Sequence, residues 1–486
     1  MSHIIFDNHQ PVLKKFLLPV AILSVIAIGW VVANIGILVP VILMAFPLVV
    51  AFVAAVFYKP QVGIVALILH AFFFAFVPRH IPATGPLFSY FPEGVALLTW
   101  LAVIVRRSDQ LDWSLVKNDL CLLAIVWFGI NLLQLLNPTG VSLIGGLSEI
   151  RTTAFNWLYI VPLCFLLFNT RKHLDFFLIL ILGCSLFATL YGMKQLHIGL
   201  DAADLKFLFE DGAATTHLIF GKLRVFSFYS DAGQFGASQA QLGLIAVILA
   251  FGPFKFWKKV LLLLAAAILL YGMLISGTRG ALFALIVGIF IYLFLCKNIK
   301  VLLLGLAVAF SGLFLLKFTY IGNTNYHIYR LRTAVNPEND ASMNVRLYNQ
   351  QRLRNYMEEL PFGGGVGVMG YNGFKYNSDK YLASIPPDSY WVKIWGMFGI
   401  VGFSIWFGMM MYILGKCCGL VWNIQDKALQ VKLIALTAGA GGVFMCSYGN
   451  EVMNMLPSSV ILYASWVFVY LGPKLDRETP VTEEHG

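Results

Sequence analysis

The sequence predicts an all-α, polytopic integral membrane protein with about 12–14 transmembrane helices. Hydrophobic residues make up 59% of the 486 positions and charged residues only 12%. Soluble domains carry about 25% charged residues. The mean hydropathy is +0.79. This composition excludes a soluble globular domain, a disordered tail and a collagen-like chain.

Fourteen apolar runs of roughly the length that crosses a bilayer follow one another along the chain. They lie at residues 16–35, 41–57, 62–77, 93–105, 119–136, 157–170, 174–193, 236–252, 260–275, 281–296, 300–319, 389–415, 432–448 and 457–472. The shortest are 93–105 and 157–170. The first run is too long for the apolar part of a signal peptide and is predicted to remain uncleaved.

The distribution of basic residues predicts an orientation with both termini in the cytoplasm. The net charge of +10 arises mainly from Lys and Arg in alternate short loops, as expected for cytoplasmic loops of membrane proteins. We therefore infer no nucleic-acid partner. The seven cysteines lie in or beside apolar runs without metal-ligand spacing, so we expect neither a disulfide nor a metal site.

The same pattern divides the chain into five parts. We expect an N-terminal transmembrane bundle at 1–193, helices with arginine-bearing outer loops at 194–319, a large periplasmic loop at 320–388, C-terminal transmembrane helices at 389–472 and a cytoplasmic tail at 473–486. Long ordered loops tend to carry function. In this one, 342–360 is rich in helix formers and ends before the helix breaker Pro361.

A glycine-rich stretch in the large loop matches the GxGxxG pattern by letter. It runs from Gly365 through Gly367 to Gly370. It follows a Pro-Phe-Gly turn instead of a strand and opens no βαβ unit, which argues against a nucleotide site. We expect a tight loop in which the backbone passes close to another segment.

Several arginines on the outer side are candidates for binding phosphate. Guanidinium groups make paired hydrogen bonds to phosphoryl oxygens. Arg279 lies between two spans, and Arg224 lies in a loop that leads into a span. Arg346, Arg352 and Arg354 share one stretch of the large loop. The alternatives are snorkelling to lipid headgroups for Arg279 and a solvated surface for the others.

Two charged residues mark the start of the span at 389. Asp388 could cap the helix, or it could accept a proton from an acceptor hydroxyl at the membrane surface. Lys393, one turn inside, is a functional candidate as an intramembrane lysine, with snorkelling as the alternative. Glu149 and Arg151 are expected to form a local ion pair. The outer histidines have no ligand spacing.

Four blocks in the C-terminal half resemble the O-antigen ligase and polymerase family. They are RVFSFYSDAGQFG at 224–236, SGTRGALFAL at 276–285, RLYNQQRLRNYMEELPFGGGVG at 346–367 and PDSYWVKIWGMFGIVG at 387–402. The resemblance implies an integral-membrane glycosyltransferase of the GT-C kind in the bacterial inner membrane. Its donor would be a glycan on undecaprenyl pyrophosphate at the periplasmic face, transferred with inversion and without a metal or other cofactor.

The resemblance also implies roles for matched residues. Asp388, Arg346 and Arg279 would be catalytic. Arg224, Arg352, Lys393 and Tyr390 would bind substrate. The sequence has no DxD motif beside a span, in agreement with a metal-free mechanism in which basic side chains stabilise the leaving pyrophosphate.

Three functions remain open at this point. Ligases of the family usually have His-Asn where this chain has Asp388-Ser389, and Asp at that position favours a repeat-unit polymerase. A ligase would use the same donor with lipid A core as the acceptor. A lipid-linked oligosaccharide flippase would need polar residues along its spans and no large outer loop, so it is the least favoured.

Overall fold

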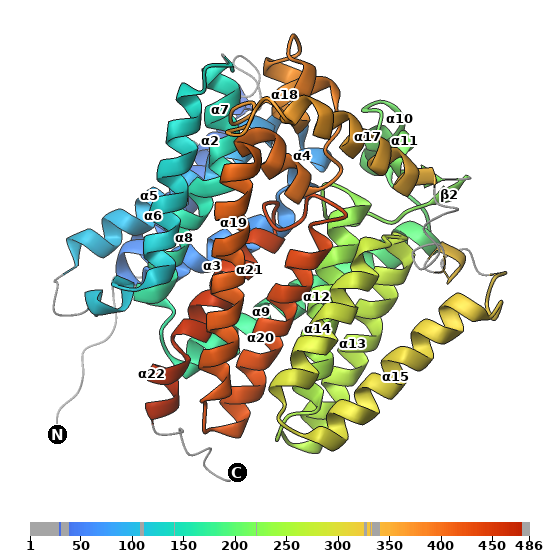
Figure 1. Ribbon diagram of the computed structural model, residues 1–486. Coiled ribbons are helices and arrows are strands. Elements are labelled where there is room, and N and C mark those ends of the chain that lie inside the picture. Colours follow the sequence, from blue (N-terminus) through green and yellow to red (C-terminus); the bar gives the residue numbers. More distant parts are fainter. Residues whose placement is uncertain are drawn as a thin grey trace, which may run out of the picture.

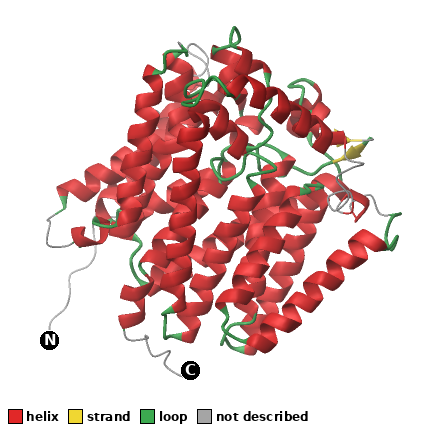
Figure 2. Cartoon of the chain, viewed as in Figure 1, coloured by secondary structure: helices red, strands yellow, loops and turns green. Residues whose placement is uncertain are grey.

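The computed structural model describes residues 29–30, 38–106, 111–139, 141–219, 221–324, 328–330, 332 and 341–478. This part of the chain is mainly helical (Figure 2). Its strands form one antiparallel pair, β1 (Leu218–Ile219) and β2 (Lys222–Leu223), in which Leu218 faces Leu223. The α-helices are α2 (Leu38–Tyr58), α3 (Gln61–Phe73), α4 (Phe76–His80), α5 (Gly85–Val105), α6 (Asp119–Leu133), α7 (Leu143–Ile150), α8 (Asn156–Leu167), α9 (Arg171–His197), α10 (Ala202–Phe209), α11 (Ala214–His217), α12 (Ala232–Ala250), α13 (Phe256–Ser276), α14 (Gly280–Leu295), α15 (Ile299–Phe318), α17 (Ala341–Met357), α18 (Gly370–Tyr376), α19 (Tyr390–Trp422), α20 (Lys427–Cys446), α21 (Ser458–Tyr470) and α22 (Gly472–Arg477).

The prediction of an all-α polytopic membrane protein is confirmed. Within the described residues, eight helices are long and apolar enough to cross a membrane, and five shorter apolar helices accompany them. Each of these helices overlaps one predicted run. The first predicted run, 16–35, lies outside the described residues except for 29–30.

The two shortest predicted spans are longer in the structure. The run at 93–105 belongs to α5, which already starts at Gly85 and contains Pro92. The run at 157–170 is the second half of a continuous helical segment, Leu143–Leu167. Pro92 and the polar residues before 157 interrupt the hydropathy pattern without ending the helices, because neighbouring helices can satisfy the freed backbone groups.

The centre of the bundle is formed by α12 and α20, which are 94% and 83% buried over their apolar windows. Small residues let these helices approach their neighbours closely. A Cβ atom built on Gly442 of α20 would lie 2.6 Å from the carbonyl oxygen of Ala284 in α14. Gln239 of α12 accepts hydrogen bonds from Ser185 and Thr189 of α9 at 3.0 and 2.9 Å. Close backbone packing and buried amide contacts therefore hold the core.

The described residues of the large loop include α17 and α18. The helix predicted within 342–360 is confirmed as α17, which ends at Met357 before Pro361. Figure 1 shows α17 and α18 together with α7 and α10 at one end of the bundle, opposite α22. Helices far apart in the sequence thus lie at the α17–α18 end, where α18 packs against α7.

The glycine run is a tight loop against other backbone, as predicted. Gly363, Gly365, Gly367 and Gly370 all have positive φ. The amides of Gly364 and Gly365 donate to the carbonyl oxygens of Gly396 and Met397 at 2.9 and 3.0 Å. These carbonyls are free because Gly399, with φ 68°, kinks α19. Glycine is required here because L residues rarely adopt such φ values.

The kink at Gly399 provides a test of this packing. A Cβ atom there would lie 2.1 Å from the carbonyl oxygen of Pro361. We expect Gly399→Ala to lower the free energy of unfolding by about 2–5 kcal/mol, from the left-handed backbone and the steric overlap. Thermal unfolding of the purified protein in detergent measures this. Gly408→Ala in the same helix is the control, since nothing lies within 4 Å of its Cβ position. Equal stability of the two variants would contradict the packing argument.

Candidate active site

A polar cavity of about 490 Å³ lies where the start of α19 meets α7, the large loop and the α20–α21 connection. Fourteen residues line it: Ser148, Glu149, Thr152, Asp231, Arg346, Tyr371, Asn372, Pro387, Asp388, Lys393, Asn450, Glu451, Asn454 and Met455. Twelve of them carry polar or charged side chains, and the exceptions are Pro387 and Met455. Its volume is in the range of ligand sites, about 300–1,000 Å³.

The first wall of the cavity comes from α7. Ser142 caps this helix by accepting a hydrogen bond from the amide of Gly145. The π-helical turn Arg151–Phe155 then joins α7 to α8 without a break. Such turns occur frequently at functional sites. Glu149 lies just before the turn, and its side chain is only 1% exposed.

The second wall comes from α19, whose first turn carries Lys393. The Nζ atom of Lys393 lies 2.9 Å from Oε1 of Glu149 and 2.9 Å from Oε2 of Glu451. The lysine side chain is only 6% exposed. The snorkelling alternative for Lys393 is therefore wrong, because its ammonium group points into the protein between two carboxylates.

The two glutamates that share Lys393 have different surroundings. Oε2 of Glu149 accepts a hydrogen bond from Asn372 at 2.8 Å, and the Thr153 hydroxyl donates to Oε1 at 3.2 Å. The Glu451 side chain is 24% exposed. Among the described residues, its Oε1 atom accepts no hydrogen bond. Glu149 is therefore a saturated buried acid, whereas Glu451 presents one oxygen to the cavity.

The expected local pair between Glu149 and Arg151 is wrong. Arg151 instead pairs with Glu93 of α5, with Nη2 2.9 Å from Oε2. The two residues lie on either side of the junction between α7 and the π turn, where helical geometry directs neighbouring side chains to different faces. Glu149 is thereby left to Lys393.

Asp388 is exposed, lies on the cavity wall and has φ 46°. The left-handed region is uncommon for residues other than glycine, although Asp is enriched there. The helix-cap interpretation of Asp388 is wrong. Ser389 caps α19, and its hydroxyl oxygen accepts a hydrogen bond from the amide of Val392 at 3.3 Å. Asp388 is thus free to present its carboxylate to the cavity in a strained backbone conformation.

The structure places Arg346 in the cavity wall together with Asp388 and Lys393. Arg279 is not among the lining residues. It precedes α14, and a Cβ atom on the next residue, Gly280, would lie 2.7 Å from Nδ2 of the lining residue Asn450. Arg279 therefore sits at the start of a helix that abuts the cavity wall.

Three other predicted site residues lie outside the cavity wall. The Arg224 guanidinium donates to the carbonyl oxygen of Thr216 at 2.9 Å and to the Thr278 hydroxyl at 3.3 Å, which fastens the turn before Arg279. The Arg352 guanidinium lies 5.5 Å from the ring centroid of Tyr381. The Tyr390 ring is buried, edge to face against Trp406, with centroids 5.6 Å apart.

Sequence reasoning missed the contribution of the α20–α21 connection. Asn450, Glu451 and Asn454 line the cavity from this segment. The available signal was an acidic residue between two apolar runs, since charged groups beside spans are functional candidates. The connection is short, so its length gave no reason to examine it.

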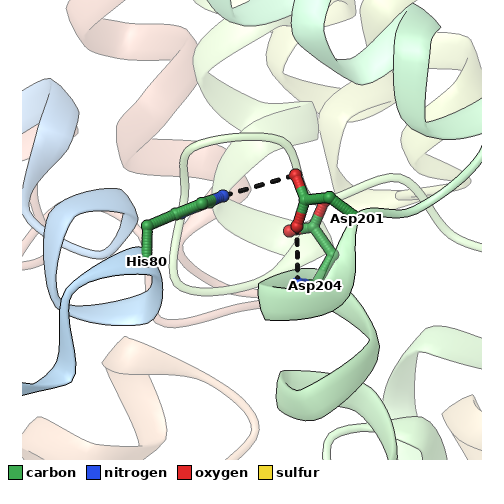
Figure 3. Close-up of side chains that lie close together, drawn as sticks. All are labelled: His80, Asp201 and Asp204. Atoms are coloured by element: carbon green, nitrogen blue, oxygen red, sulfur yellow. Dashed lines mark hydrogen bonds and ion pairs between the residues drawn. The ribbon is translucent and has the colours of Figure 1, made fainter.

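A second cluster of titratable residues joins α4 to α10. Figure 3 shows His80 with Asp201 and Asp204, whose ligand atoms lie within 4.8 Å of one another. Arg79 lies 3.4 Å from Asp204, and Lys194 lies 3.1 Å from Asp201. The geometry could hold a metal ion, but these two cations already balance the two carboxylates. We assign this cluster a structural role.

Hydrogen bonding at this second cluster favours the ionised form of Asp201. Burial alone would raise the pKa of Asp201. Hydrogen bonds from the Tyr191 hydroxyl, the amide of Asp204 and the Lys194 ammonium outweigh that effect, and they hold the pKa well below its usual value. Asp201 therefore keeps its charge, and with it the ion pair to Lys194, well into the acidic range.

The fold and the cavity define a polytopic membrane protein with a polar cavity at the end of an apolar helical bundle. Residues 264–407 match the family model described as O-Antigen ligase. The match confirms the resemblance and supports a membrane function of the O-antigen ligase and polymerase type. A search of curated proteins finds no match. The matched region contains Arg279, Arg346, Asp388 and Lys393, but neither glutamate that holds the lysine.

Lys393→Met tests whether the buried lysine holds the cavity together. It leaves Glu149 buried without its counter-ion, which should cost about 3–5 kcal/mol of folding free energy. Lys416→Met is the matched control, because Lys416 pairs with Asp119 on a more exposed surface, 35% and 24% accessible. That pair should be worth at most about 1 kcal/mol. Thermal unfolding of both purified variants measures the two losses of stability. Comparable losses of stability in the two variants would contradict the structural role of Lys393.

Proposed function

We propose that the chain is a metal-independent, inverting glycosyltransferase that moves a glycan from undecaprenyl pyrophosphate at the periplasmic face of the inner membrane. It acts as a repeat-unit polymerase, with a second lipid-linked glycan as the acceptor. The observation that carries this proposal is the cavity in which Arg346 and Asp388, both within the family-matched region, lie beside Lys393.

In this proposal the arginines bind the donor. Arg346 on the cavity wall and Arg279 beside it hold the pyrophosphate through paired N–H donors and stabilise the charge that develops as it leaves. Guanidinium groups thereby do what a divalent metal does in other transferases. Arg224 supports this arrangement through its hydrogen bond to Thr278 in the turn before Arg279.

Asp388 is proposed to act on the acceptor. The acceptor hydroxyl oxygen attacks the anomeric carbon of the donor sugar, the bond from that carbon to the phosphate oxygen breaks, and undecaprenyl pyrophosphate leaves with the electron pair. Asp388 takes the hydroxyl proton as the general base. An exposed carboxylate held in an unusual backbone conformation suits this role, because such strain clusters at functional sites.

The proposed orientation is supported by charge at the opposite end of the bundle. There Arg171 of α9 hydrogen bonds to the carbonyl oxygen of Leu475 in α22 and pairs with Asp426. Lys432 pairs with Asp175 at the same level of α9 and α20. Basic residues gather at the cytoplasmic side of membrane proteins, which would put the cavity on the periplasmic side.

The second candidate function is an O-antigen ligase that transfers the same glycan to lipid A core. The description of the matched family favours it. Asp388-Ser389 in place of the His-Asn pair usual in ligases favours the polymerase. Both functions use the same donor side of the cavity, so they differ only in the acceptor.

The glycan profile of a strain lacking this chain tests the proposed function. We expect short products bearing a single repeat unit, because ligation continues without polymerisation. Lipid-linked polymer that accumulates without reaching the lipid A core would establish the ligase instead. An unchanged profile with normal chain lengths would refute both, and complementation with the wild-type gene is the control.

Substitutions in the cavity separate arginine geometry from charge. We expect Arg346→Lys to lower the transfer rate about 10–100-fold, since lysine lacks the planar fork and one charge-assisted bond is worth about 1.5–3 kcal/mol. Arg354→Lys on the same helix, whose side chain is exposed and outside the cavity wall, should retain wild-type activity.

Asp388→Asn tests the general base. Asparagine tolerates the left-handed backbone yet cannot take a proton, so turnover should be lost. Normal rates in Arg346→Lys or Asp388→Asn would remove that residue from the mechanism.

A further inference from the structure

The connection between α20 and α21, residues 447–457, is a firmly held segment. The amide of Met453 donates to the Ser447 hydroxyl at 3.1 Å. The amide of Tyr390, at the start of α19, donates to the carbonyl oxygen of Ser447 at 3.0 Å. Gln234 of α12 hydrogen bonds to the carbonyl oxygen of Glu451. The segment can therefore present side chains to the cavity in fixed positions.

In this segment, Asn454 has a buried side chain whose polar atoms make no hydrogen bond to the described residues. It is 2% exposed and lines the cavity. Neither its Oδ1 nor its Nδ2 atom has a hydrogen-bond partner among the described residues. Buried polar groups are nearly always paired, and one left unpaired costs about 1–3 kcal/mol. A buried amide with both a donor and an acceptor unused indicates a ligand that offers both.

Glu451 offers a second unused group in the same wall. Its Oε2 atom is held by Lys393 at 2.9 Å, while Oε1 accepts no hydrogen bond among the described residues. A carboxylate accepts hydrogen bonds from hydroxyl groups, and a side-chain amide both donates hydrogen bonds to them and accepts from them. The pair Glu451 and Asn454 therefore suits a polyhydroxyl ligand.

The charge of the cavity argues against an anion at this wall. Four carboxylates line the cavity, those of Glu149, Asp231, Asp388 and Glu451, against the two cations Arg346 and Lys393. Lys393 is already shared by two glutamates. A pyrophosphate beside Glu451 would meet like charge, whereas an uncharged sugar ring would not.

We infer that Asn454 and Glu451 form the acceptor-sugar subsite of the cavity, which binds an uncharged sugar ring through its hydroxyl groups. The inference rests on the proposed function, which it extends by separating an acceptor wall at 450–454 from a donor side at Arg346 and Arg279. Asn454 and Glu451 bind and position the acceptor, and the proton still goes to Asp388.

The test measures binding apart from transfer. The probe is the free oligosaccharide released by mild acid from the lipid-linked repeat unit of the source strain, titrated calorimetrically into the purified full-length protein. We expect Asn454→Leu to weaken oligosaccharide binding about tenfold or more, as loss of two hydrogen bonds implies. Binding of inorganic pyrophosphate should be unchanged. Thermal stability should hold or rise, because the variant removes an unpaired buried amide without removing an internal bond.

Two further variants sharpen the result. Ser459→Ala removes another buried polar group without a partner among the described residues, but Ser459 does not line the cavity, so oligosaccharide binding should stay at the wild-type level. Glu451→Gln keeps the shape of the side chain and halves its capacity to accept hydrogen bonds. It should therefore weaken binding of the oligosaccharide and leave binding of pyrophosphate unchanged. If Asn454→Leu or Glu451→Gln weakened binding of the oligosaccharide and of pyrophosphate equally, the cavity would have collapsed. That result would overturn the separation of an acceptor wall from a donor side.

Water in a neighbouring space is the competing explanation. Asn454 also lines a small enclosed pocket of about 50 Å³ beside His70 and Arg151, and a space of this size can hold water. If Asn454→Leu lowers stability and leaves oligosaccharide binding unchanged, the amide serves an internal water and the subsite is refuted. A wild-type protein that binds the oligosaccharide but transfers no lipid-linked glycan would refute the proposed function instead.

Discussion

The ion pairs of Lys393 with Glu149 and Glu451 are the interaction on which the cavity depends. They join the end of α7, the first turn of α19 and the connection after α20. Removing three charged groups from water is expensive, and their attraction offsets this only when each is well bonded. The hydrogen bonds from Asn372 and Thr153 to Glu149 provide that support. One lysine thus fixes the relative position of three segments far apart in the sequence.

Backbone contacts, and not ion pairs, hold the large loop against α7 and α19. The kink at Gly399 frees the carbonyls of Gly396 and Met397, to which the glycine run is bonded. A Cβ atom on Gly367 would lie 2.6 Å from the carbonyl oxygen of Gly145 in α7. The loop therefore lies against both helices that carry the ion pairs. Asn372 reaches Glu149 because this backbone contact brings α18 over α7.

Hydropathy and local rules predicted most of the fold. Apolar runs located the described spans, the helix before Pro361 was identified by its composition, and the glycine run behaved as a tight loop. These features depend on neighbouring residues in the chain. The limits of α5 and of the segment Leu143–Leu167 were missed because tertiary contacts, and not local composition, continue those helices.

The site was only partly predictable, for a related reason. Arg346, Asp388 and Lys393 were identified from motifs, and the structure brings them into one cavity. Which carboxylates face the lysine depends on three-dimensional packing. Glu149 was assigned to its near neighbour Arg151, which in fact pairs with Glu93. Asn454 carries no sequence signal at all, since only its burial without a partner distinguishes it from other asparagines.

The family match divides the residues that line the cavity: both cations lie inside the matched region, whereas three of the four carboxylates lie outside it. Arg346 and Asp388 lie within residues 264–407, whereas Glu451 and Asn454 lie outside them. A polymerase and a ligase of this type would share the donor and differ in the acceptor. Residues that meet the shared pyrophosphate would then fall in the region that family members have in common. Residues that recognise the acceptor sugar would fall where the family model has no match, which is where the unpaired amide of Asn454 lies, whereas Asp388 takes a proton in either reaction and lies inside the match. On the proposed function, the α20–α21 connection positions the acceptor sugar, and Asp388 takes the proton from its hydroxyl group.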